Sequence, residues 1–150
     1  MSELSAHQAL ADFLHNRAAP RLPDLAFTWH TALESAGGKK TKSGIPLDVL
    51  KEKHNGTVKG VWDWLYLGPN LCTIGDNAPY FFMGIAIELK STSAYRKKDH
   101  DLSDAQKLWR ELYIRNGWYT AIYPEQDWHK TAVLLVQWVG GDERDFDFGG

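Results

Sequence analysis

A chain of 150 residues can bury one hydrophobic core, and its net charge of −2 argues against a protein that coats nucleic acid through bulk positive charge. The composition, with 43% hydrophobic and 24% charged residues, is typical of soluble globular proteins, and a single cysteine excludes an intramolecular disulfide. No apolar run reaches the roughly 18 residues that a membrane-spanning helix needs. We therefore expect one soluble domain in a reducing cytoplasm.

The first third of the chain predicts short elements. Apolar residues at helical spacing predict a helix over residues 2–17, which two prolines would end. A short strand is predicted over residues 25–29 and a loop rich in glycine and lysine over residues 34–44. A proline suited to a first helical turn predicts a short helix over residues 46–53.

Two strands are predicted in the middle of the chain. Residues 61–67 are aromatic and branched between glycines, and residues 80–90 contain the most apolar strand-like run of the sequence. Residues 71–79 between them predict a loop. The polar residues 91–101 predict a second loop, long enough to be mobile.

The clearest helix is predicted over residues 103–116. Ser103 and Gln106 have the spacing of a capping box, and Gly117 suits the left-handed stop after a helix. One apolar stripe along this helix is expected to face the core: Ala105, Leu108, Trp109, Leu112 and Tyr113.

The last elements complete an α/β pattern. Residues 118–123 alternate as a strand does, and the helix before them favours a right-handed parallel crossover from residues 80–90. Residues 128–139 fit a helix, which we favour, although four consecutive apolar residues within them would also suit a strand. The acidic residues 141–150 predict a flexible tail.

The strand over residues 80–90 ends with the residues that carry the functional hypothesis. Side chains alternate faces along a strand, so Glu88 and Lys90 share one face while Leu89 and the isoleucines face the core. A charged pair at the end of so apolar a run is unfavourable unless it is partnered or bound to a metal. The alternative is a solvated ion pair at the strand's end.

Asp63, on the preceding predicted strand, could supply a second carboxylate. Mg²⁺ is often held by one or two carboxylates, so Asp63 and Glu88 would suffice to bind Mg²⁺ or Mn²⁺. The backbone carbonyl of Leu89 could add a ligand, and Lys90 could orient a water or stabilise developing charge. Such a site would hydrolyse a phosphodiester.

Basic residues flank these strands and could contact phosphates, although such runs are more often solvated loops. The first group is Lys39, Lys40, Lys42, Lys51, Lys53 and Lys59, and the second is Arg96, Lys97 and Lys98. Seven tryptophans are many for this length. They are expected mostly in the core, and any exposed ones could stack on a ligand or bury at a subunit interface.

The chain resembles the VRR-NUC family of the PD-(D/E)xK nuclease superfamily in the order of its motifs. These motifs are residues 60–63 (Gly-Val-Trp-Asp), residues 87–90 (Ile-Glu-Leu-Lys), residues 102–106 (Leu-Ser-Asp-Ala-Gln), Trp109 and Gly117. The resemblance implies a restriction-endonuclease-like α/β core with a central mixed β-sheet flanked by helices. It also implies dependence on Mg²⁺ or Mn²⁺ and cleavage of DNA.

By matching position, the resemblance makes Asp63 and Glu88 metal ligands, Lys90 the catalytic lysine, and Gln106 a residue lining the site from the following helix. Family members often carry a further acid on the first helix, for which Glu3 is the nearest match and His7 a competing candidate. Trp62 stands where the family usually has proline, and the valine-arginine-arginine signature is absent after Gly117.

Compact members of this family resemble phage and bacterial enzymes that act as homodimers on branched DNA, including four-way junctions, whereas larger relatives process flaps. The resemblance therefore implies a homodimeric endonuclease in the cytoplasm of a bacterium or a phage-infected cell. A module that keeps the fold and binds nucleic acid without cutting it is the alternative. Metal-dependent hydrolysis of another phosphate ester is a third possibility.

Overall fold

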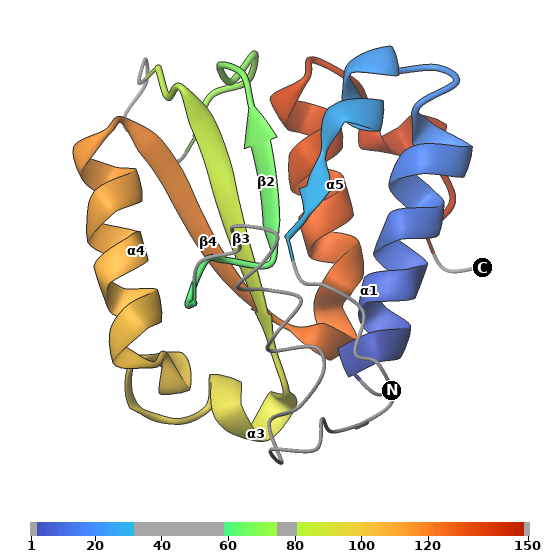
Figure 1. Ribbon diagram of the computed structural model, residues 1–150. Coiled ribbons are helices and arrows are strands. Elements are labelled where there is room, and N and C mark those ends of the chain that lie inside the picture. The colour runs from blue at the N-terminus through green and yellow to red at the C-terminus, as the bar shows by residue number, and fades with distance from the viewer. Residues whose placement is uncertain (1–2, 32–58, 75–80, 149–150) are drawn as a thin grey trace, which may run out of the picture.

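The computed structural model describes residues 3–31, 59–74 and 81–148, which form a mixed sheet with helices on both faces (Figure 1). Helix α4 covers one face, and helices α1 and α5 lie side by side on the other (Figure 1). The α/β class and the mixed, helix-flanked sheet predicted from the sequence are confirmed.

The sheet has four strands in the order β1-β2-β3-β4. β1 (Trp29–His30) pairs antiparallel with β2 (Trp64–Leu67), which pairs antiparallel with β3 (Gly84–Lys90). β4 (Trp118–Pro124) runs parallel to β3. The strands predicted over residues 61–67, 80–90 and 118–123 therefore exist, although β2 and β3 each begin a few residues later than the sequence indicated.

The larger core lies between the sheet and the two packed helices. α1 (Glu3–Asp12) continues into a π-helical turn, η1 (Phe13–Ala18), which together match the predicted first helix. A short turn, η4 (Glu125–Asp127), leads from β4 into α5 (Trp128–Trp138), so the favoured helix of the last segment is confirmed. Apolar residues of β3 fill this core from the sheet: Ile85, Ile87 and Leu89.

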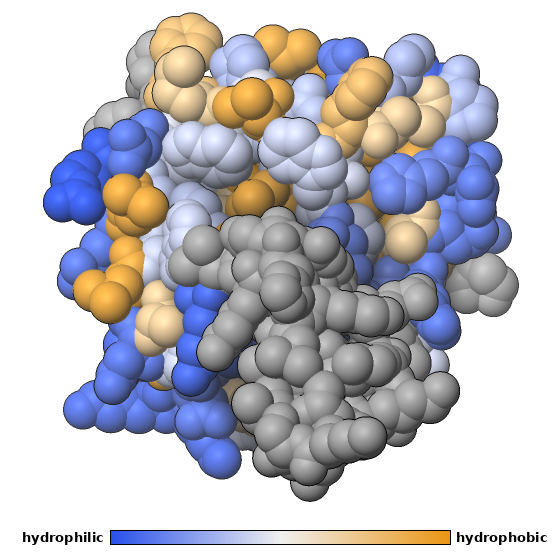
Figure 2. Space-filling view, in the orientation of Figure 1, coloured by the Kyte–Doolittle hydropathy of each residue, from blue (hydrophilic) through white to orange (hydrophobic). Residues whose placement is uncertain are grey.

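The smaller core lies under α4 (Asp104–Arg115) and contains Trp62, Ala86, Leu102 and Tyr113. The predicted apolar stripe of α4 was too wide. Leu108 is 67% exposed and Leu112 is also exposed, because the helix touches the sheet along a narrow row of residues four apart. Apolar surface accordingly lies over α4 in Figure 2.

Both ends of α4 form as the sequence predicts. The Ser103 hydroxyl accepts from the Gln106 amide at 3.1 Å, and the Gln106 side chain accepts from the Ser103 amide at 2.9 Å, which is a complete capping box. Gly117 has a φ of 78°, the left-handed conformation that favours glycine after a helix. The helix therefore links β3 to the parallel strand β4, as expected.

Two predictions of local structure were wrong. Residues 91–101 form α3 (Thr92–Tyr95) and η3 (Lys98–Asp101) instead of a mobile loop, because the Ser91 hydroxyl caps α3 by accepting from the Ala94 amide. Residues 25–29 are mostly a short helical turn, η2 (Pro23–Phe27), which begins at a proline. Within this segment only Trp29 belongs to a strand.

Some predictions lie outside the described residues. The loop over residues 34–44 and the helix over residues 46–53 fall there, as does the latter half of the loop over residues 71–79. Among the described helices, none is long and apolar enough to cross a membrane.

The C-terminal segment packs on the large core. It contains a short turn, η5 (Glu143–Asp145), and the rings of Phe146 and Phe148 lie 5.6 Å and 4.7 Å from the ring of Phe13. The sequence prediction of a flexible tail was based on the acidic charge of this segment and did not take its two aromatic rings into account.

The tryptophans divide between the interior and the surface. Trp62, Trp64 and Trp138 are fully buried, whereas Trp29 on the edge strand β1 is 54% exposed. Each buried indole N–H has a hydrogen-bond acceptor, as a buried polar group requires. The expectation that tryptophans fill the core is therefore met by these three residues.

The turn before Asp63 packs directly against α4. Gly60 has a φ of 86°, and a Cβ built on it would lie 2.5 Å from the Cβ of Ala105. The indole N–H of Trp109 donates to the Lys59 carbonyl at 3.2 Å. These contacts fix the path of the chain as it enters the sheet.

We predict that Gly60→Ala destabilises the protein by about 3 kcal/mol, because it adds a backbone clash to the strain of a positive φ. Gly117→Ala is the matched control, since φ is also positive there but the nearest atom to an added Cβ is 3.5 Å away. That control should lose about 1 kcal/mol. Urea unfolding measures both, and equal losses would contradict close packing at Gly60.

Candidate active site

The carboxyl end of β3 carries the predicted Glu88 and Lys90 on the face that α4 covers. Glu88 is 3% exposed and the Lys90 side chain is 15% exposed, so neither is an ordinary surface residue. The two charged groups lie 3.5 Å apart. The alternative of a solvated pair at the strand's end is therefore wrong.

Asp63, immediately before β2, meets Glu88 across the strand pair. The Asp63 amide donates to Glu88 Oε1 at 3.1 Å, and the Leu89 amide donates to Asp63 Oδ2 at 2.9 Å. These two bonds hold the carboxylates of Asp63 and Glu88 beside one another. The structure thus brings together the two acids that the sequence separates by 25 residues.

Trp62, directly before Asp63, makes hydrogen bonds that a proline at this position could not make. The Trp62 amide donates to the Tyr113 hydroxyl at 3.3 Å, and its indole N–H donates to the Gln106 carbonyl at 3.1 Å. A proline has neither donor. Fully buried Trp62 therefore fixes the segment before Asp63 by hydrogen bonds to α4.

Gln106 connects the acidic and basic groups of the site. Its side-chain amide donates to Glu88 Oε2, and its carbonyl oxygen accepts from Lys90 Nζ at 3.0 Å. The same oxygen accepts from the Ser103 amide in the capping box. Gln106 therefore contacts Glu88 and Lys90 and caps α4 at the same time.

The segment after α3 approaches Lys90 in an unusual conformation. Asp99, His100 and Asp101 all have positive φ, between 51° and 57°, which is strained for residues other than glycine. Arg110 on α4 holds this segment through two bonds of 2.8 Å to the Asp99 carboxylate, and this pairing lowers the pKa of Asp99. The Asp101 carbonyl accepts from Lys90 Nζ at 3.4 Å.

Burial raises the pKa of Glu88 to about 8, with a further increase from the neighbouring Asp63 carboxylate, and Lys90 only partly opposes this rise. The close approach of Asp63 and Glu88 therefore favours retention of a proton by this pair in the metal-free protein. A cation between Asp63 and Glu88 would favour the deprotonated form instead.

Two histidines join the site from the other side of Asp63. One ligand atom from each of His7, His30 and Asp63 lies within 4.8 Å of the other two. His7 was a candidate from the first helix, but His30 was missed. It reaches the site because β1 pairs with β2 and places His30 opposite Trp64, a long-range pairing that no local pattern reveals.

The remaining predicted site residues either lie at exposed positions or have side chains outside the described residues. Glu3 begins α1, but its side chain is outside the described residues. Arg96, Lys97 and Lys98 are exposed just after α3 and at the start of η3, and Lys59 is exposed beside α4. The other lysines predicted to contact DNA lie outside the described residues: Lys39, Lys40, Lys42, Lys51 and Lys53.

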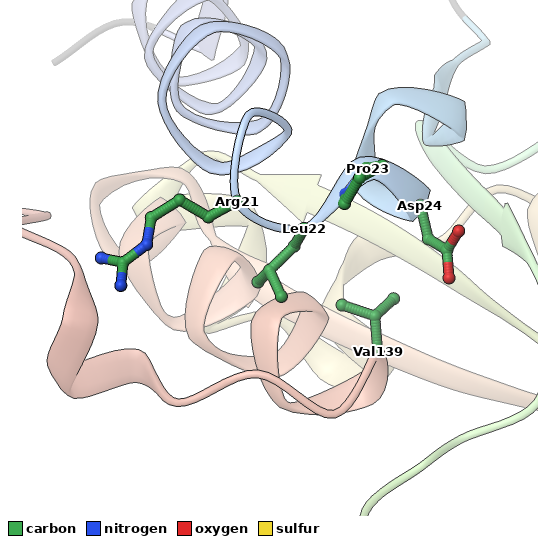
Figure 3. A pocket seen from close by; sticks show the side chains of 5 residues that line it. All are labelled: Arg21, Leu22, Pro23, Asp24 and Val139. Atoms are coloured by element: carbon green, nitrogen blue, oxygen red, sulfur yellow. The ribbon is translucent and has the colours of Figure 1, made fainter.

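A small cavity lies elsewhere and is separate from these residues. It measures about 170 Å³ and lies between η2 and the end of α5, as Figure 3 shows for Leu22 and Val139. Arg21 and Asp24 give it one charge of each sign. None of its lining residues belongs to the carboxylate site.

The fold and the site together define a class, an α/β domain with acids and a lysine at the end of a central strand. No protein-family model and no curated protein matches the chain. A solved structure described as "VRR_NUC domain protein" superposes with a TM-score of 0.56 at 15% sequence identity, over 94% of this chain and 92% of that chain. That likeness shows that the chain shares the fold of this protein, in agreement with the fold predicted from the sequence.

The high pKa of Glu88 predicts a pH-dependent loss of stability in the metal-free protein. The folded state keeps a proton that the unfolded state releases near pH 4.5, so stability should fall as pH rises from there and level off above about 8. Glu88→Gln should remove a loss on the order of 5 kcal/mol.

Urea unfolding in EDTA at about pH 5, 7 and 9 measures this loss. Glu111→Gln, at an exposed position of α4, is the control and should keep the wild-type profile. Parallel profiles for wild type and Glu88→Gln would contradict a raised pKa for Glu88.

Proposed function

We propose that this protein is a divalent-metal-dependent endonuclease that hydrolyses phosphodiester bonds in DNA. The observation that carries the proposal is the meeting of Asp63 and Glu88 beside Lys90 at the end of β3. Two adjacent carboxylates, one of them buried, are mutually repulsive unless they share a proton or a cation. Binding a cation therefore gives this arrangement a purpose that folding alone does not.

The donor set fits a hard cation. Asp63 and Glu88 offer carboxylate oxygens, and the Leu89 carbonyl would be the third oxygen from the protein, which suits Mg²⁺ or Mn²⁺. Such an ion supplies charge neutralisation at the phosphate and lowers the pKa of a bound water. Asp63 and Glu88 would orient this ion, and the proton on Glu88 would leave as it binds.

Lys90 and Gln106 would act on the reacting groups. The Lys90 ammonium would stabilise charge on the phosphate oxygens as a water oxygen attacks phosphorus and the bond to the leaving sugar oxygen breaks. The attacking water loses one proton to solvent, and the leaving oxygen gains one. Gln106, bonded to Glu88 and Lys90, would keep the two side chains in place.

The proposal extends to branched DNA, such as four-way junctions or flaps, and to a homodimer, on the strength of the resemblance to compact VRR-NUC proteins. Exposed Leu108 and Ile114 on α4 offer apolar area for such an interface. The cytoplasm of a bacterium or a phage-infected cell is the corresponding location.

The alternative is a module that binds nucleic acid without cutting it. The raised pKa of Glu88 and its close contact with Asp63 favour the enzyme, since a binding module has no need of an unfavourable buried acid pair. Hydrolysis of another phosphate ester would appear as activity on small esters without cleavage of DNA.

Cleavage of labelled DNA tests the proposal. Wild-type protein with Mn²⁺ should cut linear, flap or four-way junction DNA, and EDTA should stop it. Asp63→Asn, Glu88→Gln and Lys90→Met should each reduce the rate on the order of 10²-fold or more, because each removes a ligand or a charge that the transition state needs.

Glu111→Gln and Lys130→Met remove the same charges from exposed positions and should cut at the wild-type rate. Equal residual cleavage by wild type and the three site variants would refute the site assignment. DNA binding without cleavage and without Mn²⁺ binding by calorimetry would establish the binding module instead.

DNA affinity as a function of salt tests the exposed basic group after α3. Replacing Arg96, Lys97 and Lys98 together by glutamine should lower the slope of log affinity against log salt by about two to three, because fewer counterions are released. A control triple variant replaces Arg17, Arg21 and Arg144, which lie near the C-terminal segment. Equal slopes for both variants would place the DNA elsewhere.

A further inference from the structure

His7 on α1 is 8% exposed, and its ring is bound by a group that can only donate. The indole Nε1–H of fully buried Trp64 lies 3.0 Å from His7 Nδ1. An indole N–H has no acceptor capacity, so Nδ1 must carry the lone pair that receives it. The neutral imidazole therefore has its proton on the other nitrogen, Nε2.

That proton lies on the side of the site. His7 Nε2 is 3.8 Å from Asp63 Oδ2, and the same carboxylate oxygen accepts from the Leu89 amide at 2.9 Å. A nitrogen that coordinates a metal must offer a lone pair, which Nε2 lacks in this tautomer. Coordination through Nε2 would move the proton to Nδ1, against the Trp64 N–H.

Turning the ring does not remove this constraint. Rotation by half a turn would put a carbon in place of Nδ1 and leave the buried indole N–H without an acceptor, which is unfavourable. The ring of His30 lies 4.6 Å from that of His7 and 4.7 Å from that of Trp64. The three rings thus form one packed group in which Trp64 sets the orientation of His7.

We propose that His7 completes the site as a hydrogen-bond donor directed at Asp63, and not as a metal ligand, with Trp64 fixing this role. His7 is then a positioning residue for Asp63 and for water or phosphate oxygen between the two side chains.

This role makes His7 a determinant of metal choice. Because His7 does not coordinate the cation, α1 adds no nitrogen ligand next to Asp63. This favours Mg²⁺ and Mn²⁺ over Zn²⁺. Without the Trp64 N–H, the imidazole proton could move to Nδ1. Nε2 would then offer a lone pair that could bind Zn²⁺. The inference rests on the proposed function only in that Asp63 and Glu88 hold the cation.

Nitrogen NMR of histidine-labelled protein at about pH 8 tests the proposal, with His7→Gln to assign the signals. In metal-free wild type, His7 should show one tautomer with the proton on Nε2, and equimolar Zn²⁺ should leave its Nε2 signal unshifted. A proton on Nδ1, averaging between tautomers, or a Zn²⁺-induced shift at His7 Nε2 would overturn the proposal.

Trp64→Phe provides the second measurement. This variant should lose the single tautomer, show a Zn²⁺ shift at His7 Nε2, and bind Zn²⁺ about tenfold more tightly by calorimetry. Trp138→Phe is the matched control, because it removes another fully buried indole, whose N–H donates to the Gly68 carbonyl and not to His7. Identical Zn²⁺ behaviour in the two variants would also overturn the proposal.

The tautomer is read without metal, so it does not depend on the proposed function. If the wild-type protein does not bind Mn²⁺, the proposed nuclease function is contradicted. The tautomer of His7 still tests the proposed role of His7 in that case. A Nδ1 proton in a protein that binds Mn²⁺ would contradict the role of His7 alone.

Discussion

The contact between the carboxylates of Asp63 and Glu88 is the constraint on which the site depends. One acid lies immediately before β2 and the other near the end of β3, and the backbone amides of Asp63 and Leu89 join them. Burial and like charge oppose the ionised form of Glu88, which raises its pKa to about 8. The sheet therefore holds an unfavourable pair in place, and a cation between them would relieve it.

Most neighbouring features serve to hold this pair. Gly60 allows the chain to approach α4, and Trp62 bonds to that helix with its amide and its indole. Gln106 then reaches back from α4 to Glu88 and Lys90. Loss of stability at such a site is a common consequence of arranging groups for function and not for folding.

The sequence predicted those parts of the fold that depend on local patterns. The capping box at Ser103 and the apolar run before Glu88 mark α4 and β3 because the signals are adjacent in the chain. Alternation along β3 placed Glu88 and Lys90 together, the preceding strand offered Asp63 as a second carboxylate, and the resemblance supplied Gln106 as a residue lining the site. The width of the α4 contact was misjudged, since periodicity does not say how much of a helix the sheet covers.

Other features depend on contacts that the sequence does not display. His30 enters the site only through pairing between β1 and β2, and the role of His7 follows from a hydrogen bond to Trp64, 57 residues away. The left-handed segment at Asp99 is held by Arg110 on another helix. Such positions are set by tertiary packing, which overrides local preference.

Anomalous diffraction from crystals soaked in Mn²⁺ would test the central claim most directly. A peak bounded by Asp63, Glu88 and the Leu89 carbonyl, with His7 Nε2 outside coordination distance, is the predicted result. The absence of a peak between the two carboxylates at saturating Mn²⁺, or a peak held by other residues, would contradict the cation site.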